Sequence, residues 1–151
     1  MATTVIGPVH FQCARYRREN SFDTTVDIHD HIILKAGAVD GIRMPQKLGD
    51  LVRAELHRRQ LPTPIIVNTA TEYRMFLTQG AGPDNRPIAL FAKLFRCQAI
   101  GTVPGALVML PCPADQVRFW LDQPEGMRRP PFDTVVEITL HAAKAFPGAT
   151  A

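Results

Sequence analysis

IGTVPGALVMLPCP, residues 100–113, is the most apolar run of the chain, and the other segments are expected to pair with it or to cover it. Ala106 to Leu110 is too short for a stable helix and rich in strand-forming residues, which predicts a buried central strand. Pro111 and Pro113 follow at once. Because proline has no amide hydrogen to donate to a neighbouring strand, this strand must end there.

Successive side chains of a strand point to opposite faces, so one alternating set in this strand should be fully buried. The two candidate sets are Leu107 with Met109, and Val108 with Leu110. Residues 98–102, just before it, are the expected pairing partner. The segment therefore places a hairpin at the centre of the predicted sheet.

Three segments carry apolar residues at helical spacing, and each begins at a proline, which suits the first turn of a helix. These helices are expected after Met44-Pro45, after Pro87 and over residues 131–145. Their predicted buried stripes are Leu48, Leu51, Val52 and Leu56 in the first; Ile88, Phe91, Ala92 and Phe95 in the second; and Phe132, Val135, Val136 and Ala143 in the third.

Strand patterns occupy much of the remaining chain. Residues 65–67 and 72–78 predict a hairpin with its turn at 68–71, and residues 24–34 alternate as one strand. Val5 to Phe11 is a candidate edge strand, because Pro8 is tolerated only at an edge or bulge. Residues 37–41 are expected to form a turn, and residues 114–121 fit either a short helix or a strand.

These elements predict one α+β domain over residues 1–151. Its centre is a mainly antiparallel sheet of about four to six strands, and three helices pack on that sheet. A chain of 151 residues is long enough for one domain with one core. Residues 1–4 and 147–151 are expected to fray.

Composition restricts the classes of function. The formal charge of +3 and the isoelectric point near 9.0 permit an acidic partner without requiring one. Three widely spaced cysteines, without any CxxC or CxxH pair, predict neither a disulfide framework nor a structural zinc site. Neither a phosphate-binding GxxxxGK[ST] nor a GxGxxG pattern occurs, and no cofactor is expected. The apolar runs are too short to span a membrane and the first residues lack a signal-peptide pattern, so the cytoplasm is the expected location.

Short arginine clusters are the candidate nucleic-acid-binding residues. In the first cluster, arginines would bind phosphates while Tyr16 stacks on a base, as on single strands. The alternative is an ordinary solvated surface, and the arginines near residue 58 also suit the negative end of a helix dipole. The full candidate set is Arg15, Tyr16, Arg17, Arg18, Arg58, Arg59, Arg128 and Arg129.

Asp27, His29 and His31 are the candidate metal ligands. At spacing i, i+2 and i+4 they fall on one face of the predicted strand, and carboxylate with imidazole suits zinc, iron or nickel. The first and last of them lie about 13 Å apart on an extended strand, so all three bind one ion only if the strand bulges, whereas two of them could do so together with a distant ligand. The alternative is a solvated polar face.

Five stretches carry a resemblance to a known family: LGDLVRAEL (48–56), PIIVNTATEYRMFLT (64–78), GALVMLPCP (105–113), VRFWLDQP (117–124) and RPPFDTVV (129–136). In this order they resemble small actinobacterial proteins related to the bifunctional DNA primase/polymerase domain. That domain carries an Asp-x-Asp or Asp-x-Glu metal pair and a later Ser-x-His, and this sequence has none of these motifs. The resemblance therefore implies the fold and not the nucleotidyl-transfer chemistry, which needs carboxylates converging on two metal ions.

The leading hypothesis is a non-catalytic α+β module that binds nucleic acid or a protein partner. Its alternative is a metal-dependent hydrolase or transferase that uses Asp27, His29 and His31. A serine or cysteine hydrolase is a poorer third, because no GxSxG occurs and Cys112 lies between two prolines at an apolar strand end. No membrane partner is expected, and homo-oligomerisation is left open.

Overall fold

The computed structural model describes residues 7–82 and 87–146; the segments predicted to fray, 1–4 and 147–151, lie outside these ranges. Within them the chain forms four helices and eight strands. The helices are α1 (Pro8–Asn20), α2 (Gln46–Arg58), α3 (Ile88–Arg96) and α4 (Phe132–Ala143). The strands are β1 (Thr24–Val26), β2 (Ile32–Lys35), β3 (Val39–Met44), β4 (Ile65–Asn68), β5 (Arg74–Gln79), β6 (Ile100–Gly101), β7 (Leu107–Leu110) and β8 (Arg118–Asp122).

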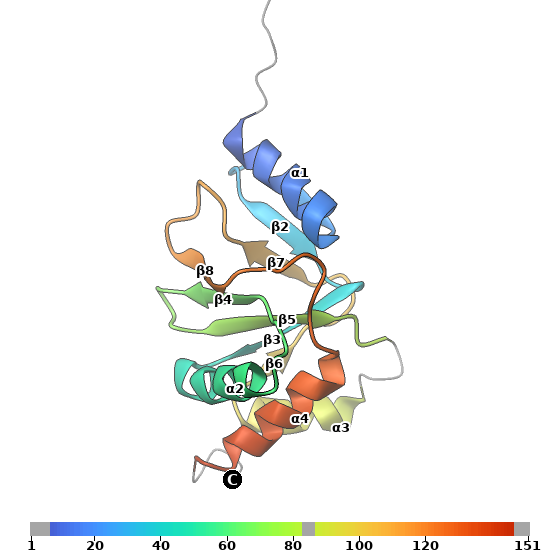
Figure 1. Ribbon diagram of the computed structural model, residues 1–151, viewed down its shortest axis with the longest axis vertical. Coiled ribbons are helices and arrows are strands. Elements are labelled where there is room, and N and C mark those ends of the chain that lie inside the picture. Colours follow the sequence, from blue (N-terminus) through green and yellow to red (C-terminus); the bar gives the residue numbers. More distant parts are fainter. Residues whose placement is uncertain (1–6, 83–86, 147–151) are drawn as a thin grey trace, which may run out of the picture.

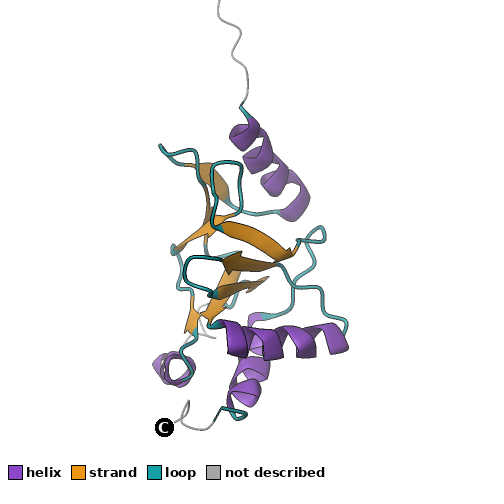
Figure 2. Cartoon of the chain, turned by 90° about the vertical axis from the view of Figure 1, so that its left-hand side faces the viewer, coloured by secondary structure: helices purple, strands orange, loops and turns teal. Residues whose placement is uncertain are grey.

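Two antiparallel sheets lie between α1 and the other three helices. The larger sheet has the strand order β6-β3-β5-β4-β8, and the smaller has the order β1-β2-β7. Figure 1 shows α1 at the top, the sheets in the middle and α2, α3 and α4 at the bottom, and Figure 2 shows the same separation after a quarter turn. The α+β class is confirmed and the five-stranded sheet has the expected size, but the count of three helices is wrong and a second sheet is present.

The larger sheet buries apolar side chains on both faces. Ile42, Met44 and Phe76 point to the face covered by helices. On that face they join the buried helical residues Leu48, Val52, Leu56, Leu94, Phe132, Val135 and Val136. The opposite face packs against the smaller sheet and α1, in a cluster of Val39, Ile66, Leu77, Ile32, Leu34, Val108, Leu110, Val9, Cys13 and Tyr16.

β7, the strand expected at the centre, lies at the edge of the smaller sheet. It pairs with β2, whereas residues 100–101 form β6 and pair with β3, so the predicted hairpin of 98–102 with 106–110 is wrong. Val108 and Leu110 are 6% and 0% exposed, and Leu107 is 67% exposed. The buried set is therefore the one that faces the larger sheet, while Leu107 points away from it.

β3 was not predicted, although it lies between β6 and β5. The turn expected at residues 37–41 is therefore wrong from Val39 onward; Asp40 and Gly41 disfavour strands, so the sequence carries no clear strand signal there. A β-carbon on Gly41 would lie 2.6 Å from Sδ of Met75 and 3.3 Å from the carbonyl oxygen of Phe76, so a larger residue would have to displace the Met75 side chain. The same residue that conceals the strand allows its close packing on β5.

The N-terminal part of the fold corrects two predictions. Residues 8–11, taken as part of an edge strand, begin α1, with Pro8 at the first helical position; Val5 and Ile6 of that prediction lie outside the described residues. Residues 24–34 are not one strand but a hairpin of β1 and β2 around a turn at 27–31. The helices expected after Pro45, after Pro87 and over residues 131–145 are confirmed as α2, α3 and α4, and so is the β4–β5 hairpin.

Residues 114–121, which fit either a helix or a strand, lead into and form most of β8. Oδ1 of Asp115 accepts hydrogen bonds of 3.0 Å from the backbone amides of Val117 and Arg118, which turns the chain into the strand. Among the described helices, none is long and apolar enough to cross a lipid bilayer.

Candidate functional site

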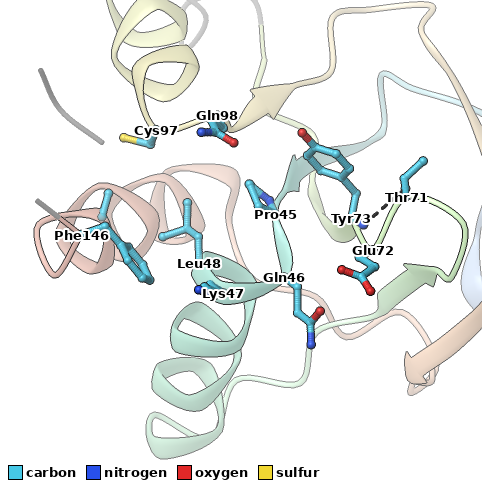
Figure 3. A pocket seen from close by; sticks show the side chains of 11 residues that line it. Pro45, Gln46, Lys47, Leu48, Thr71, Glu72, Tyr73, Cys97, Gln98 and Phe146 are labelled. Carbon is cyan, nitrogen blue, oxygen red and sulfur yellow. Dashed lines mark hydrogen bonds between the residues drawn. The ribbon is translucent and has the colours of Figure 1, made fainter. Parts of the chain in front are cut away.

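A cavity of about 750 Å³ opens where the start of α2, the ends of α3 and α4 and the β4–β5 turn meet (Figure 3). Its wall is apolar where Leu48, Ala143 and Phe146 line it. Its polar lining residues are Gln46, Lys47, Thr71, Glu72, Tyr73 and Gln98. The guanidinium of Arg43 lies 5.1 Å from the centroid of the Tyr73 ring, which helps to fix that ring.

The cavity can hold a ligand but lacks a catalytic pair. Cys97 is its one thiol, and burial raises the pKa of that thiol. Its Sγ donates to the carbonyl oxygen of Lys93 at 3.4 Å. None of the described lining residues is a histidine or an aspartate, and the one carboxylate among them, Glu72, lies in the β4–β5 turn, away from Cys97 (Figure 3). Cys97 therefore stays a protonated, packed side chain rather than a nucleophile.

The outward side of α3 is the second candidate. Leu94 is fully buried, and Leu90 and Phe91 pack partly buried against the core. Ile88 and Phe95, in contrast, are 90% and 70% exposed. The predicted buried stripe is therefore wrong at both of its ends. α3 has apolar residues around most of its circumference, so the sequence allows two stripes, and the core takes the one centred on Leu90 and Leu94.

Charges on the same helix are all positive. Lys93 and Arg96 are exposed, and neither forms an ion pair with any residue that the structure describes. Residues 88–96 contain no aspartate or glutamate. Surface helices normally carry polar residues and charged residues of both signs on the solvent side. The outward side of α3 is instead apolar and cationic.

The predicted arginine clusters lie apart, because the α1 cluster and the α2 cluster belong to helices on opposite sides of the two sheets (Figure 1). Glu19 lies 2.9 Å from Nε of Arg15 and 3.8 Å from a terminal nitrogen of Arg18. Arg17 donates to the carbonyl oxygen of Thr24 at 3.1 Å. The first cluster is thus engaged largely within α1 and its surroundings.

The second cluster converges on one carboxylate. Glu55 accepts hydrogen bonds from both Arg58 and Arg59, and these bonds lower the pKa of Glu55 to about 2. Because the ion pairs are exposed, they contribute little to stability, but they offset the positive charge that a phosphate would meet. In the two helical clusters, a carboxylate therefore lies beside every arginine except Arg17.

The third cluster divides. Arg129 donates to the carbonyl oxygen of Asn20 at 2.9 Å and lies 5.3 Å from the centroid of the Phe22 ring, and its burial lowers the pKa of its guanidinium. It serves to hold the 123–130 loop on the end of α1. Arg128 is exposed and lines a separate cavity of about 690 Å³ beside His57. Nucleic-acid binding by these arginines stays a prediction.

Tyr16 does not present its ring to a base. The side chain is 4% exposed, and burial raises the pKa of its hydroxyl. That hydroxyl donates to the carbonyl oxygen of Pro111 at 2.7 Å and accepts from Nε1 of Trp120 at 3.0 Å. Tyr16 joins α1 to the ends of β7 and β8, which is a structural role.

The candidate metal ligands lie in the β1–β2 turn rather than on a strand face. Oδ1 of Asp27 accepts from the backbone amides of His29 and His31, at 2.9 Å each, which also lowers the pKa of Asp27. The aspartate thus shapes the turn. Among the described residues, no three side chains of histidine, cysteine, aspartate or glutamate are placed to hold a metal ion. The geometry gives the metal-dependent alternative no support.

Sequence reasoning missed a partly buried ion pair between α2 and β8. Asp122 accepts two hydrogen bonds of 2.9 Å from Arg53 and lies 2.9 Å from Nε2 of His57. Arg53, and then His57, hold the pKa of Asp122 below its usual range. The described residues that line the adjoining cavity include no serine or cysteine, and the hydroxyl of Thr63 donates to the carbonyl oxygen of Leu61 at 3.0 Å. Because no free nucleophile lies beside it, this pair fastens β8 to α2.

A comparison with family models finds no match to this chain, and comparisons with curated proteins and with solved structures find none either. The resemblance to proteins related to the primase/polymerase domain therefore stays a prediction.

Proposed function

We propose that this chain is a non-catalytic binding module whose partner is a protein that docks on the outward side of α3. The supporting observation is the exposure of Ile88 and Phe95, 90% and 70%, on a helix whose opposite side is part of the core. Single exposed apolar residues are ordinary on protein surfaces. Two bulky ones that share a side of a nine-residue helix form a patch, which indicates an interaction site.

The spacing of the two side chains suits helix recognition. Residues i and i+7 lie two turns apart on the same side of a helix, or about 10 Å along its axis. Partner proteins commonly read such i, i+3, i+4 and i+7 positions. Full burial of an isoleucine or phenylalanine side chain contributes roughly 1.5–3 kcal/mol, so these two residues can supply much of a docking energy.

A protein partner is better supported than nucleic acid. Four of the predicted arginines, Arg15, Arg18, Arg58 and Arg59, face Glu19 or Glu55. The aromatic side chain proposed for stacking, Tyr16, is buried. The relationship to primase/polymerase-related proteins remains part of the proposal as a statement about fold alone, since the catalytic motifs are missing from the sequence.

Site-specific photo-crosslinking in cells tests the proposal. A photoreactive amino acid replaces Phe95 in one protein and Ile28 in a second; Ile28 is 93% exposed in the β1–β2 turn and serves as the matched control. The expected result is a discrete adduct with another protein from position 95 and none of that mass from position 28. The adduct should disappear when Ile88→Asp is added. Identical adduct patterns from both positions would contradict the proposal.

A further inference from the structure

We infer that the partner presents an apolar helix bordered by carboxylates; this inference rests on the proposed docking side of α3. A chemical class for the partner follows from what the outward side contains. At 100° per residue, Ile88, Ala92 and Phe95 fall within an arc of about 60°. Arg96, Ala89 and Lys93 follow in that order around the exposed side.

The small residues shape the surface. Ala92 is half-buried and lies between the bulky apolar side chains and Arg96, whereas Ala89 is exposed and lies between Arg96 and Lys93. Interaxial distances of packed helices depend on the side chains at the contact, and alanines allow a close approach. A partner helix laid along this side would contact Ile88 and Phe95 with its apolar stripe.

Charge complementarity indicates which residues should border the apolar stripe of the partner helix. Lys93 and Arg96 form no ion pair with the described residues, and α3 has no acidic side chain. A partner that brings aspartate or glutamate beside its apolar residues would meet both cations. Such pairing at the rim of an interface steers association and suppresses wrong partners.

The same charges disfavour a second copy of this chain. In a two-fold symmetric contact the same patch serves both subunits. An α3–α3 contact would therefore bring Lys93 and Arg96 of both copies together without any α3 carboxylate to offset them. Like charges placed opposite each other across an interface are destabilising.

An anionic membrane surface is also less favoured. A helix that lies in a membrane interface buries a broad apolar face in lipid. Here Leu90, Phe91 and Leu94 turn toward the protein core, so Ile88 and Phe95 are the bulky apolar side chains of α3 left for lipid. Two side chains give a small buried area, whereas a complementary protein surface can enclose them on several sides.

Selection from a random 16-residue peptide display library tests the inference directly. The target is the full chain, and enriched peptides are then synthesised and titrated by fluorescence anisotropy. Three variants are compared with the wild type: Ile88→Ser/Phe95→Ser, Lys93→Glu/Arg96→Glu and the control Ile28→Ser. Thermal unfolding of each variant confirms that the exposed substitutions leave the fold intact.

The expected result is enrichment of peptides with apolar residues at helical spacing and an excess of aspartate and glutamate beside them. Ile88→Ser/Phe95→Ser and Lys93→Glu/Arg96→Glu should each weaken their binding by roughly tenfold or more, as loss of central anchors or paired charges does. Ile28→Ser should change nothing. Selection on Lys93→Glu/Arg96→Glu should instead enrich lysine and arginine.

The opposing outcomes separate the inference from the proposed function. Peptides that depend on Ile88 and Phe95 but show no acidic excess would overturn the partner chemistry and leave the docking side intact. Absence of any peptide that depends on α3 would overturn both. Two other results would also overturn both: self-association of the chain, or its sedimentation with vesicles containing phosphatidylserine, provided that Ile88→Ser/Phe95→Ser abolished that self-association or sedimentation.

Discussion

Leu110 and Leu107 lie in the same short strand, and replacing each with alanine should give very different losses of stability. Leu110 is fully buried in β7, opposite Ile32 of β2, in the cluster between the two sheets. Leucine-to-alanine removes three carbon groups, and about 0.8 kcal/mol for each gives a transfer loss near 2.4 kcal/mol. The cavity left behind raises the expected total to about 3–5 kcal/mol.

Leu107 is the internal control for that measurement, since it is 67% exposed at the other end of the strand. Its replacement should cost less than about 0.5 kcal/mol, the usual range for surface sites. Equilibrium urea unfolding, followed through the fluorescence of the single tryptophan, Trp120, measures both. Equal losses, or a larger loss at Leu107, would refute the arrangement, because a one-residue shift in strand register exchanges the two faces.

Three further predictions concern side chains that the structure places in specific contacts. Tyr16→Phe should cost about 1–3 kcal/mol by leaving the Pro111 carbonyl oxygen and the Trp120 indole without their partner, and a loss below about 0.5 kcal/mol in urea unfolding would contradict this. Asp122→Asn should cost roughly 1–2 kcal/mol at neutral pH. Because folding lowers the pKa of Asp122, this contribution is present above the unfolded pKa near 3.8 and is lost as the pH falls through the folded pKa. The stabilities of wild type and variant should therefore converge in acid, and a difference that does not change with pH would count against the prediction. Binding of a labelled single-stranded oligonucleotide should be weak, with log affinity falling with log salt at a slope of about −2 to −4 if three to five arginines meet phosphates; tight, sequence-selective binding in anisotropy titrations would oppose that.

Elements with complete local signals could be predicted from the sequence. Pro45 and Pro131 mark the starts of α2 and α4, and every residue of their predicted stripes is buried except Leu51, which is 40% exposed. α1 also carries a helical pattern in its sequence. Val9, Cys13, Tyr16 and Asn20 are spaced by four, three and four residues, and all four are buried.

What could not be predicted depends on contacts between distant residues. Asp40 in β3 accepts hydrogen bonds from the Thr102 hydroxyl at 2.7 Å and the Ala81 amide at 2.8 Å, and no local sequence pattern predicts these contacts. The contact of Arg53 with Asp122 spans 69 positions. On α3, the choice between two apolar stripes depends on the sheet and α4 beside it, and that choice is what exposes Ile88 and Phe95.

The central claim is that a protein partner docks on the outward side of α3. The most direct test is to purify the partner identified by cross-linking and to measure hydrogen–deuterium exchange of the chain with and without it. The account predicts that the partner slows exchange over residues 88–96 and leaves the turn at 27–31 unchanged, and that Ile88→Ser/Phe95→Ser removes the protection. Protection confined to α1 or to the 123–130 loop, with α3 exchanging at its free rate, would contradict the claim.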